Sequence, residues 1–466
     1  MTIFRKYNGA AVSDVDVTQV QTSGTRIAEI NGVPIFAPNG GGGGGGDIPL
    51  QNIAIQIPDK VYAVVGTELN IWNDAISLSI DRGLQSPINY YVEWNCGKGK
   101  ITDRGFQYTP VSSDVGTHNC TCYLYDNWGT LLAQKTFQIV VKAKNALASA
   151  KSILFVSDSL GAISYSNTNA NFSDANRFGG TAPTIYNEST GGWHWGSYAT
   201  EGTTMQRVQV SGVTALNVGA IYTTGDNYNY EIREVNITEG TGNILVKKYN
   251  NPPYGIRDLP IPSGTLTKVS GSGDSSFNYT GGVNEAGNPF WNNGVIDVAY
   301  YRNKKNIVNP FDMVIFQLGI NSNGDINVSG RIQGYIDALY SAFMADNPNC
   351  LFILSCTPIC TNDQSAIGSN YGAQSKTWGI GYAMNEYKFR VLYYALVAAT
   401  STYPNMKAIG TNLAVDRYYG YPSSQKSISD RYSTQETQHT NLVHPATSGY
   451  QQIGDSLFAS IIGLFS

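Results

Sequence analysis

Three short, predominantly apolar runs stand out after residue 150, at positions 153–156, 313–318 and 351–354. A run that lacks polar alternation is typical of a parallel strand buried on both of its faces. We therefore expect each of these segments to be a strand of a parallel sheet.

Apolar residues at helical spacing accompany these runs. Between the last two runs the spacing marks one face of a helix: Ile332, Ile336, Leu339 and Phe343. The same spacing recurs at the end of the chain: Ile453, Leu457, Ile461 and Phe465. Strands that alternate with helices predict an α/β domain with a doubly wound parallel sheet, which we place at residues 146–466.

Two other parts of the chain have a β pattern. Within residues 49–145, apolar and polar residues alternate in short stretches separated by turn-forming residues, as at 53–57 and 136–141. Evenly spaced short strands predict an immunoglobulin-like β-sandwich. Residues 205–287 are rich in Thr, Asn, Gly and Tyr, and they predict a β-rich subdomain inserted into the α/β domain.

Residues 1–48 have the pattern of an appendage. A short predicted strand at 24–32 is followed by seven consecutive glycines, Gly40 to Gly46. Polyglycine loses more entropy on ordering than any other sequence, so it predicts a flexible linker. No Gly-Lys-Ser/Thr follows it, which excludes a phosphate-binding loop of the P-loop type.

Composition narrows the classes of function. Charged residues make up 14% of the 466 residues and the net charge is −4, without a basic run that would predict a nucleic-acid partner. The N-terminus lacks the apolar core of a signal peptide, and no stretch of about 18 apolar residues predicts a membrane span. No histidine and cysteine spacing predicts a metal site, and no cofactor motif is present.

The six cysteines leave their redox state open. They are Cys96, Cys120, Cys122, Cys350, Cys356 and Cys360. Cys96 faces either Cys120 or Cys122 if the β-sandwich prediction holds. Free buried thiols are the alternative, because nothing in the sequence requires an oxidising compartment.

The first candidate for chemistry is Ser159, which directly follows the apolar run 153–156 in Ser157-Asp158-Ser159-Leu160. A serine between a buried strand and a helix lies at the carboxyl edge of the sheet, where open α/β sheets bind ligands. The helix N-terminus there favours a developing negative charge. Taken alone, such a serine is more often a helix N-cap than a nucleophile.

Three further segments fit the same edge. Gly191-Gly192 permits a close approach to the backbone, Asn321 follows the strand at 313–318, and His444 precedes the C-terminal helix. Each has an ordinary alternative as a turn residue or a solvated loop histidine. Their occurrence together, in this order, is what favours a site.

In this combination the sequence resembles the SGNH hydrolase superfamily, also called the GDSL esterases. Ser157-Asp158-Ser159-Leu160 resembles the Gly-Asp-Ser-Leu block, Gly192 the glycine block, Gly319-Ile320-Asn321 the Gly-x-Asn-Asp block, and Asn441-Leu442-Val443-His444 the Asp-x-x-His block. The resemblance implies a doubly wound SGNH sheet and a serine esterase mechanism.

The roles implied by the resemblance fall on a few residues. Ser159 would attack an ester carbonyl, and His444 would take its proton and return it to the leaving alcohol. The backbone N–H groups of Ser159 and Gly192, with the Asn321 side chain, would form an oxyanion hole. No cofactor and no metal is implied.

The sequence departs from the family pattern at three positions. Ser157 replaces a glycine, Ser322 an aspartate, and Asn441 the aspartate that orients the histidine. The last departure is the most serious, because aspartate to asparagine in a serine protease triad lowers turnover about 10⁴-fold. Asn441 could orient His444 through its carbonyl, the site could work as a Ser–His dyad, or Asp430 or Glu436 could substitute.

The resemblance and the extra β modules together suggest O-deacylation, above all O-deacetylation, of a polysaccharide. Trp193, Trp195 and Trp291 are candidates to stack on sugar rings. Residues 1–48 resemble the start of bacteriophage tail or baseplate proteins, which implies an anchor to tail proteins and a virion-associated enzyme acting on host glycans. The alternatives are a catalytically weakened glycan-binding or structural virion protein and a secreted bacterial esterase; the oligomeric state stays open.

Overall fold

The computed structural model describes the chain in segments: residues 26–30, 33–36, 54–78, 91–125, 129–144, 147–162, 168–169, 174–201, 205–224, 229–249, 263–285, 287–322, 328–361, 363, 366, 392–393 and 396–465. The predicted polyglycine linker and most of the N-terminal segment lie outside these residues. Within that segment, β1 (Arg26–Ile30) and β2 (Val33–Phe36) pair antiparallel.

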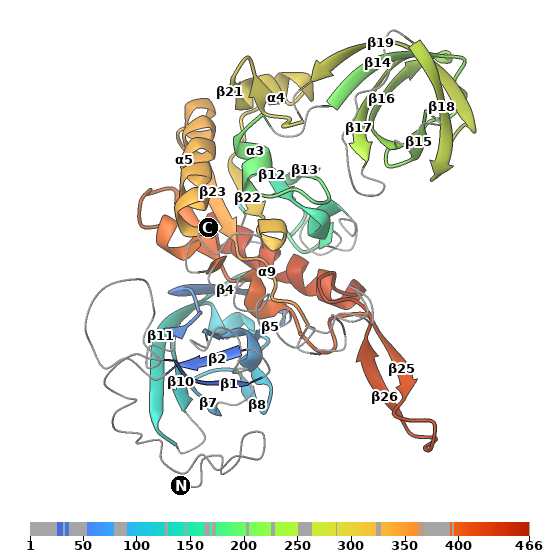
Figure 1. Ribbon diagram of the computed structural model, residues 1–466. Helices are drawn as coiled ribbons and strands as arrows, with labels where there is room; N and C mark the ends of the chain where they lie inside the picture. Colours follow the sequence, from blue (N-terminus) through green and yellow to red (C-terminus); the bar gives the residue numbers. More distant parts are fainter. Residues whose placement is uncertain are drawn as a thin grey trace.

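A five-stranded, all-parallel sheet forms the centre of the α/β domain (Figure 1). Its order is β13-β12-β22-β23-β24, with every neighbouring pair parallel. The strands are β12 (Ser152–Ser157), β13 (Thr184–Ser189), β22 (Met313–Gln317), β23 (Leu351–Ser355) and β24 (Met406–Ile409). The three apolar runs became the three central strands, so the prediction of a parallel sheet is confirmed.

Helices cover the two faces of this sheet. On one face, α5 (Val328–Asp346) buries Ile332, Ile336, Leu339 and Phe343 against alternate residues of the strands, such as Val314 and Phe352. On the other face, α9 (Thr447–Phe465) packs against the remaining strand residues. The three central strands are predominantly apolar because both of their faces are covered.

The strands of residues 54–142 form two sheets. One has the order β4-β11-β10-β7 and the other β5-β9-β8, and β3 pairs with β6 beside them. The first sheet consists of β4 (Lys60–Val64), β11 (Leu131–Lys142), β10 (Gly116–Tyr125) and β7 (Tyr91–Cys96). The others are β5 (Leu69–Trp72), β9 (Gly105–Tyr108), β8 (Lys100–Thr102), β3 (Ala54–Ile55) and β6 (Ser77–Leu78).

The two sheets contact each other through aromatic side chains. The rings of Trp94 on β7 and Phe106 on β9 have centroids 5.8 Å apart. The pair of β4 and β11 is parallel, although the other pairs in these two sheets are antiparallel. A β domain is therefore present, but its specific assignment as immunoglobulin-like is not confirmed.

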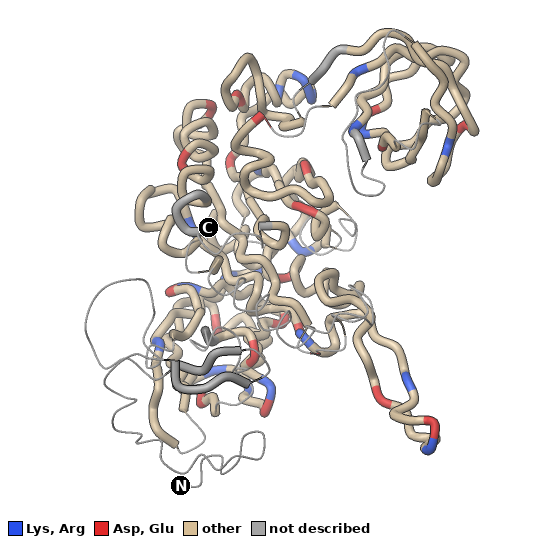
Figure 2. The backbone as a smooth tube through the Cα atoms, viewed as in Figure 1, with Lys and Arg blue, Asp and Glu red and all other residues tan. Residues whose placement is uncertain are grey.

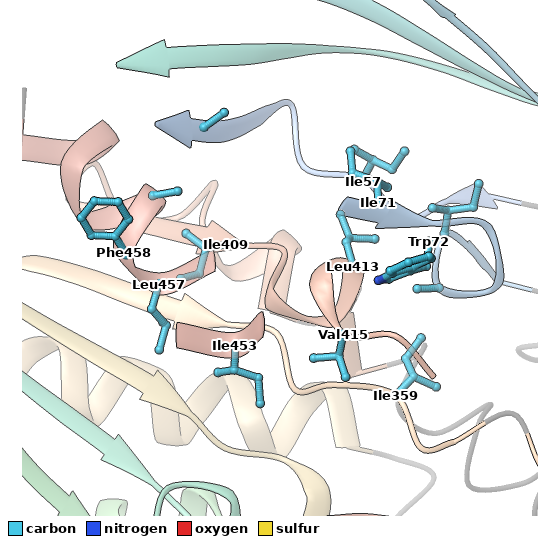
Figure 3. Packing of buried hydrophobic residues seen from close by; sticks show 14 of the residues in the cluster. Ile57, Ile71, Trp72, Ile359, Ile409, Leu413, Val415, Ile453, Leu457 and Phe458 are labelled. Carbon is cyan, nitrogen blue, oxygen red and sulfur yellow. The ribbon is translucent and has the colours of Figure 1, made fainter. Parts of the chain in front are cut away.

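This β domain shares one hydrophobic core with the α/β domain. Ile57, Ile71 and Trp72 of the β domain lie beside Leu413, and they belong to one cluster of buried residues with Ile453, Leu457 and Phe458 of α9 (Figure 3). A Cβ at Gly463 of α9 would lie only 1.9 Å from the ring of Tyr62 on β4, so the helix and the strand are in close contact. Because apolar packing is continuous across the junction, we expect the two domains to unfold together.

The strands from Met205 to Glu285, where the sequence predicts a β-rich insertion, close into a six-stranded barrel of order β14-β17-β16-β15-β18-β19. Its interior is a separate core of buried residues such as Val208, Ile232 and Tyr279. The barrel projects from the α/β domain (Figure 1). Its strands are β14 (Met205–Ser211), β15 (Ile221–Thr223), β16 (Asn229–Thr238), β17 (Thr241–Tyr249), β18 (Ser263–Ser270) and β19 (Ser276–Glu285).

Smaller elements complete the described chain. A hairpin of β25 (Ser423–Ser427) and β26 (Gln435–His439) extends away from the body of the molecule (Figure 1). The remaining elements are α3 (Trp195–Ala199), α4 (Val298–Lys304), α8 (Thr411–Ala414), β20 (Trp291–Asn292), β21 (Val295–Ile296) and the 3-10 turns η1 (Asn73–Ala75), η3 (Ser112–Asp114) and η4 (Ile320–Ser322).

Two global properties follow from the described residues. Positions of basic and acidic residues alternate along the backbone in the view of Figure 2 and do not separate into one basic and one acidic half. No helix among the described residues is long and apolar enough to cross a membrane.

The cysteines divide into a bonded pair and buried thiols. Cys96 on β7 and Cys120 on β10 are directly opposite each other and form a disulfide. Of the two pairings that the sequence left open for Cys96, this is the one observed. The other cysteines are buried and lie outside this disulfide: Cys122, Cys350, Cys356 and Cys360.

Candidate active site

Ser159 lies in the first turn of a helix that begins directly after β12. The preceding Asp158 shapes this transition, because its Oδ1 accepts the backbone N–H of Leu160 at 3.0 Å. The buried strand ends at the carboxyl edge of the sheet, and Ser159 remains only half-buried. The strand therefore fixes the serine at the edge where open parallel sheets bind ligands.

His444 lies opposite this serine. Its Nε2 is 2.9 Å from Ser159 Oγ, although the two residues are 285 positions apart in the sequence. The histidine comes from the loop between β26 and α9, and it is half-buried. A hydrogen bond of this length is the arrangement in which an imidazole can take the hydroxyl proton.

Asn441 does not have the role predicted for it. Its Oδ1 accepts the backbone N–H groups of Val443 at 3.0 Å and His444 at 2.8 Å, instead of an N–H of the imidazole. Short polar side chains commonly form such turns with their own backbone. Asn441 thus fixes the shape of the histidine loop, and the expectation that its carbonyl orients the ring is wrong.

His444 Nδ1 has no hydrogen-bond partner among the residues that the structure describes. The two carboxylates considered as substitutes are elsewhere. Glu436 is exposed on β26, where it accepts the side-chain N–H of Gln438, and Asp430 is exposed between the two strands of the projecting hairpin. Within the described chain, the arrangement is therefore a Ser–His dyad.

The two glycines form a tight turn beside the serine. Trp193 N–H donates to Thr190 O at 3.2 Å, and Gly192 has φ +79°, a conformation that a residue with a side chain rarely adopts. A Cβ at Gly191 would lie 3.9 Å from Ser159 Cβ. The structure thus brings the predicted glycine turn next to Ser159, and both glycines are exposed.

Asn321 links a third strand end to the same turn. It lies in η4, just after β22, and its Nδ2 donates to Trp193 O at 2.9 Å. An asparagine amide carries two N–H donors, so one remains after this bond is made. The side chain is exposed at the same edge as Ser159, as the sequence predicted.

The tryptophans proposed for sugar stacking are mostly structural. Trp193 and Trp195 are 3% and 1% exposed and belong to the core beneath the sheet edge, where Trp195 stacks on Phe316 at 5.4 Å. The expectation that these two rings contact a sugar is wrong, because their faces are covered by protein. Trp291 on β20 is half-buried and keeps part of its surface accessible.

Burial governs the electrostatics of the site. Desolvation raises the pKa of the Asp158 carboxyl to about 7, although nearby backbone amides of Leu160, Gly319 and Ile320 lower it. Asp158 is a residue of the site whose burial and raised pKa the sequence did not predict. The only signal was its place in the Ser-Asp-Ser-Leu motif, where nothing predicts that its carboxyl is buried.

Desolvation also lowers the pKa of His444 below its ordinary value of 6.5. A lowered pKa keeps the imidazole neutral at pH 7, and the neutral ring is the form that can accept a proton. No group of three or more metal-ligating side chains gathers within the described part of the chain. The chemistry that these residues can perform is nucleophilic attack by a hydroxyl with an adjacent base.

The lowered pKa of His444 predicts the pH dependence of any reaction that uses this residue as a base. The rate constant kcat/KM for an activated ester should rise with pH as the imidazole loses its proton, with a midpoint below 6.5 because burial disfavours the charged ring. A pH–rate profile measures this midpoint. A rising limb centred above 6.5 would contradict the lowered pKa.

Comparison with known proteins gives distant likenesses. No family model matches the chain, and no curated protein matches it. Among solved structures, a protein of Parabacteroides merdae described as a GDSL-like lipase is 11% identical to this chain, with a TM-score of 0.27. The alignment covers 68% of this chain and 99% of the lipase-like chain. A peptidoglycan O-acetylesterase is also 11% identical, with a TM-score of 0.26, covering 68% and 92%.

A carbohydrate esterase family 2 enzyme of Corynascus thermopiles, with its carbohydrate-binding domain, is 11% identical, with a TM-score of 0.26, covering 86% of this chain and 91% of its own. Likenesses at these TM-scores are too distant to carry an assignment of fold or function. For this chain, both assignments depend on the parallel sheet and on the geometry at its carboxyl edge.

Proposed function

We propose that this protein is a serine esterase of the SGNH type that removes O-acyl groups, above all O-acetyl groups, from a polysaccharide. The observation that carries the proposal is the 2.9 Å contact between His444 Nε2 and Ser159 Oγ at the carboxyl edge of the parallel sheet. It joins the two residues whose motifs resemble the first and last blocks of that superfamily.

In the proposed mechanism, Ser159 Oγ attacks the ester carbonyl while His444 Nε2 takes its proton. The resulting imidazolium returns this proton to the alcohol oxygen as the carbon–oxygen bond breaks, which leaves an acyl group on Ser159. A water molecule, deprotonated by His444, then attacks the acyl-serine, and the imidazolium returns the proton to Ser159 Oγ as the bond to the acyl group breaks and the acid is released. The same base serves both halves of the reaction.

The negative charge of the tetrahedral intermediate needs donors near Ser159. The backbone N–H groups of Ser159 and Gly192 and the second amide N–H of Asn321 are the candidates, because all three residues lie at one sheet edge. Each oxyanion donor typically lowers the barrier by about 3–4 kcal/mol. The Asn321 contact with Trp193 O fixes the amide against the glycine turn, so this donor is preorganised.

A polymeric substrate is supported by the openness of the site. Gly191, Gly192 and Asn321 are exposed, and Ser159 is half-buried, so the acyl group can be presented by a large molecule that stays outside the fold. The additional β domain and the projecting barrel offer further surface on the same chain.

A second candidate function is glycan binding, or a structural role, by a catalytically weakened site. The specific observation in its favour is that His444 Nδ1 lacks a carboxylate partner among the described residues. In a serine protease triad, loss of that carboxylate lowers turnover about 10⁴-fold. Such a loss still leaves measurable catalysis when the nucleophile and the base are both present.

The Ser159→Ala variant should lose at least about a thousandfold in kcat/KM for p-nitrophenyl acetate and should release no acetate from acetylated xylan, because the nucleophile is absent. Ser341→Ala is the matched control: this serine is exposed on α5, and its replacement should leave the rate within about twofold. Full activity in Ser159→Ala would refute the proposal, and an inactive wild type would favour the binding function.

We also propose that residues 1–48 anchor the enzyme to a bacteriophage tail, where it would act on host surface glycans. The support is the resemblance of this segment to the start of tail and baseplate proteins. Deleting residues 1–48 should abolish incorporation into particles, measured by immunoblotting of purified virions, and leave ester hydrolysis unchanged. Normal incorporation of the truncated protein would contradict this role.

A further inference from the structure

The histidine loop is held by a neighbouring segment, residues 416–422, which follows α8. On one side of His444, Thr440 N–H donates to Pro422 O at 2.8 Å, and His439 Nε2 is 2.5 Å from Tyr418 O. On the other side, Ala446 N–H donates to Gly420 O at 2.8 Å. The catalytic candidate is therefore bracketed by hydrogen bonds to one short stretch of backbone.

Close packing adds to these bonds. A Cβ at Gly449 would lie 2.3 Å from Gly420 O, so the first turn of α9 lies directly against the same segment. A displacement of residues 416–422 would therefore move the histidine loop, because there is no space between the two that could absorb it. The position of His444 depends on what fixes residues 416–422.

Asp416 is one of the residues that fix this segment; Arg417, which donates from Nη1 to Asp74 O of the β domain at 2.7 Å, is another. The Oδ1 of Asp416 accepts the backbone N–H groups of Tyr418 at 2.9 Å and Tyr419 at 3.0 Å, which folds the chain into a turn. Its own N–H donates to Gln452 Oε1 of α9 at 2.8 Å. Asp416 is 5% exposed, and a buried carboxylate is stable only when a positive charge and hydrogen bonds compensate it.

The compensating charge comes from the β domain. Arg104, in the turn between β8 and β9, donates from Nη1 and Nη2 to the two oxygens of Asp416 at 2.9 and 2.5 Å. Its guanidinium also lies between two aromatic rings, 4.7 Å from the centroid of Trp72 and 4.9 Å from that of Tyr419. A bidentate pair that is also stacked fixes both the distance and the plane of the interaction.

We propose that Arg104 is a positioning residue for His444, so that the β domain is part of the machinery of the site in the α/β domain. The proposal rests on the esterase function proposed above. Arg104 holds Asp416, Asp416 holds the turn at 416–419, and the backbone of 418–422 holds both ends of the histidine loop. Arg104 itself touches neither Ser159 nor His444 among the contacts of the described residues.

The contacts from Arg104 to the histidine loop affect the orientation of His444 more strongly here than they would in a complete Ser–His–Asp triad. A carboxylate on Nδ1 would orient the imidazole directly, but His444 has no such partner among the described residues. The orientation of the ring then depends on the backbone that carries it. Misplacement of a catalytic group by about 1 Å can cost about 100-fold in rate.

The test compares Arg104→Ala and Arg104→Lys with a matched control, Arg177→Ala. Arg177 also bridges the two domains: its guanidinium donates to Thr67 Oγ1 of the β domain at 3.2 Å and to Asp455 of α9 at 2.7 Å, and neither of these partners belongs to residues 416–422. Amide hydrogen exchange measured by mass spectrometry reports on the loop in every variant, whether or not the protein is active.

Arg104→Ala should raise the exchange rate of the amides at 440–446 by about tenfold or more, while Arg177→Ala should leave them at the wild-type rate. Arg104→Lys keeps the charge but loses the bidentate and stacked geometry. Its exchange rate at 440–446 should therefore lie between those of the wild type and Arg104→Ala. With p-nitrophenyl acetate, Arg104→Ala should lower kcat by about tenfold or more and leave KM within about twofold, because the base is displaced and the acyl site is not.

Unchanged exchange at 440–446 in Arg104→Ala, or an equal rise in Arg177→Ala, would overturn the proposal. If Arg104→Ala does not fold, the same comparison is made between Arg104→Lys and Arg177→Lys. An inactive wild type would count against the esterase function alone, since the exchange measurement would still decide whether Arg104 positions the loop.

Discussion

Burial of the parallel sheet on both faces is the constraint from which the site follows. The strands β12 and β22 are covered by α5 on one side and α9 on the other, so polar groups reach solvent at the ends of the strands, and those of the site lie at the carboxyl end. Ser159, the glycine turn and Asn321 all lie at that edge. His444 reaches it because α9, which covers the sheet, begins directly after the histidine loop.

Around the Ser159–His444 pair, the other polar side chains of the site bind backbone rather than one another. Asn441 accepts backbone N–H groups of its own loop, Asn321 donates to Trp193 O, and Asp158 accepts the N–H of Leu160. Each of them stabilises a turn rather than a neighbouring side chain. Such a site depends strongly on the rigidity of its surroundings, and the continuous core shared with the β domain provides that rigidity.

The central strands were predictable because burial on both faces leaves a predominantly apolar run. The edge strands β13 and β24 were not predicted, since an edge strand is partly exposed and Thr184–Ser189 carries polar residues throughout its length. The order of motifs along the chain was enough to select Ser159 and His444. It could not reveal that Trp193 and Trp195 are buried, because an aromatic residue beside a loop serves a core or a ligand equally well.

Long-range contacts were beyond the reach of sequence patterns. Arg104 and Asp416 are 312 positions apart, and neither belongs to a motif. The closed barrel could be predicted only as a β-rich stretch, because alternation identifies strands but not the partner of each strand. The role of Asn441 was missed for a related reason: the residue type suits both a backbone turn and a contact with the imidazole.

The most direct test of the Ser159–His444 pair is covalent labelling of the wild-type protein with a fluorophosphonate, followed by mass spectrometry of its peptides. Such reagents react with a serine that an adjacent base activates. We expect one adduct, on Ser159, that disappears in His444→Ala. An unlabelled wild type, or an adduct that persists in His444→Ala, would contradict activation of this serine by this histidine.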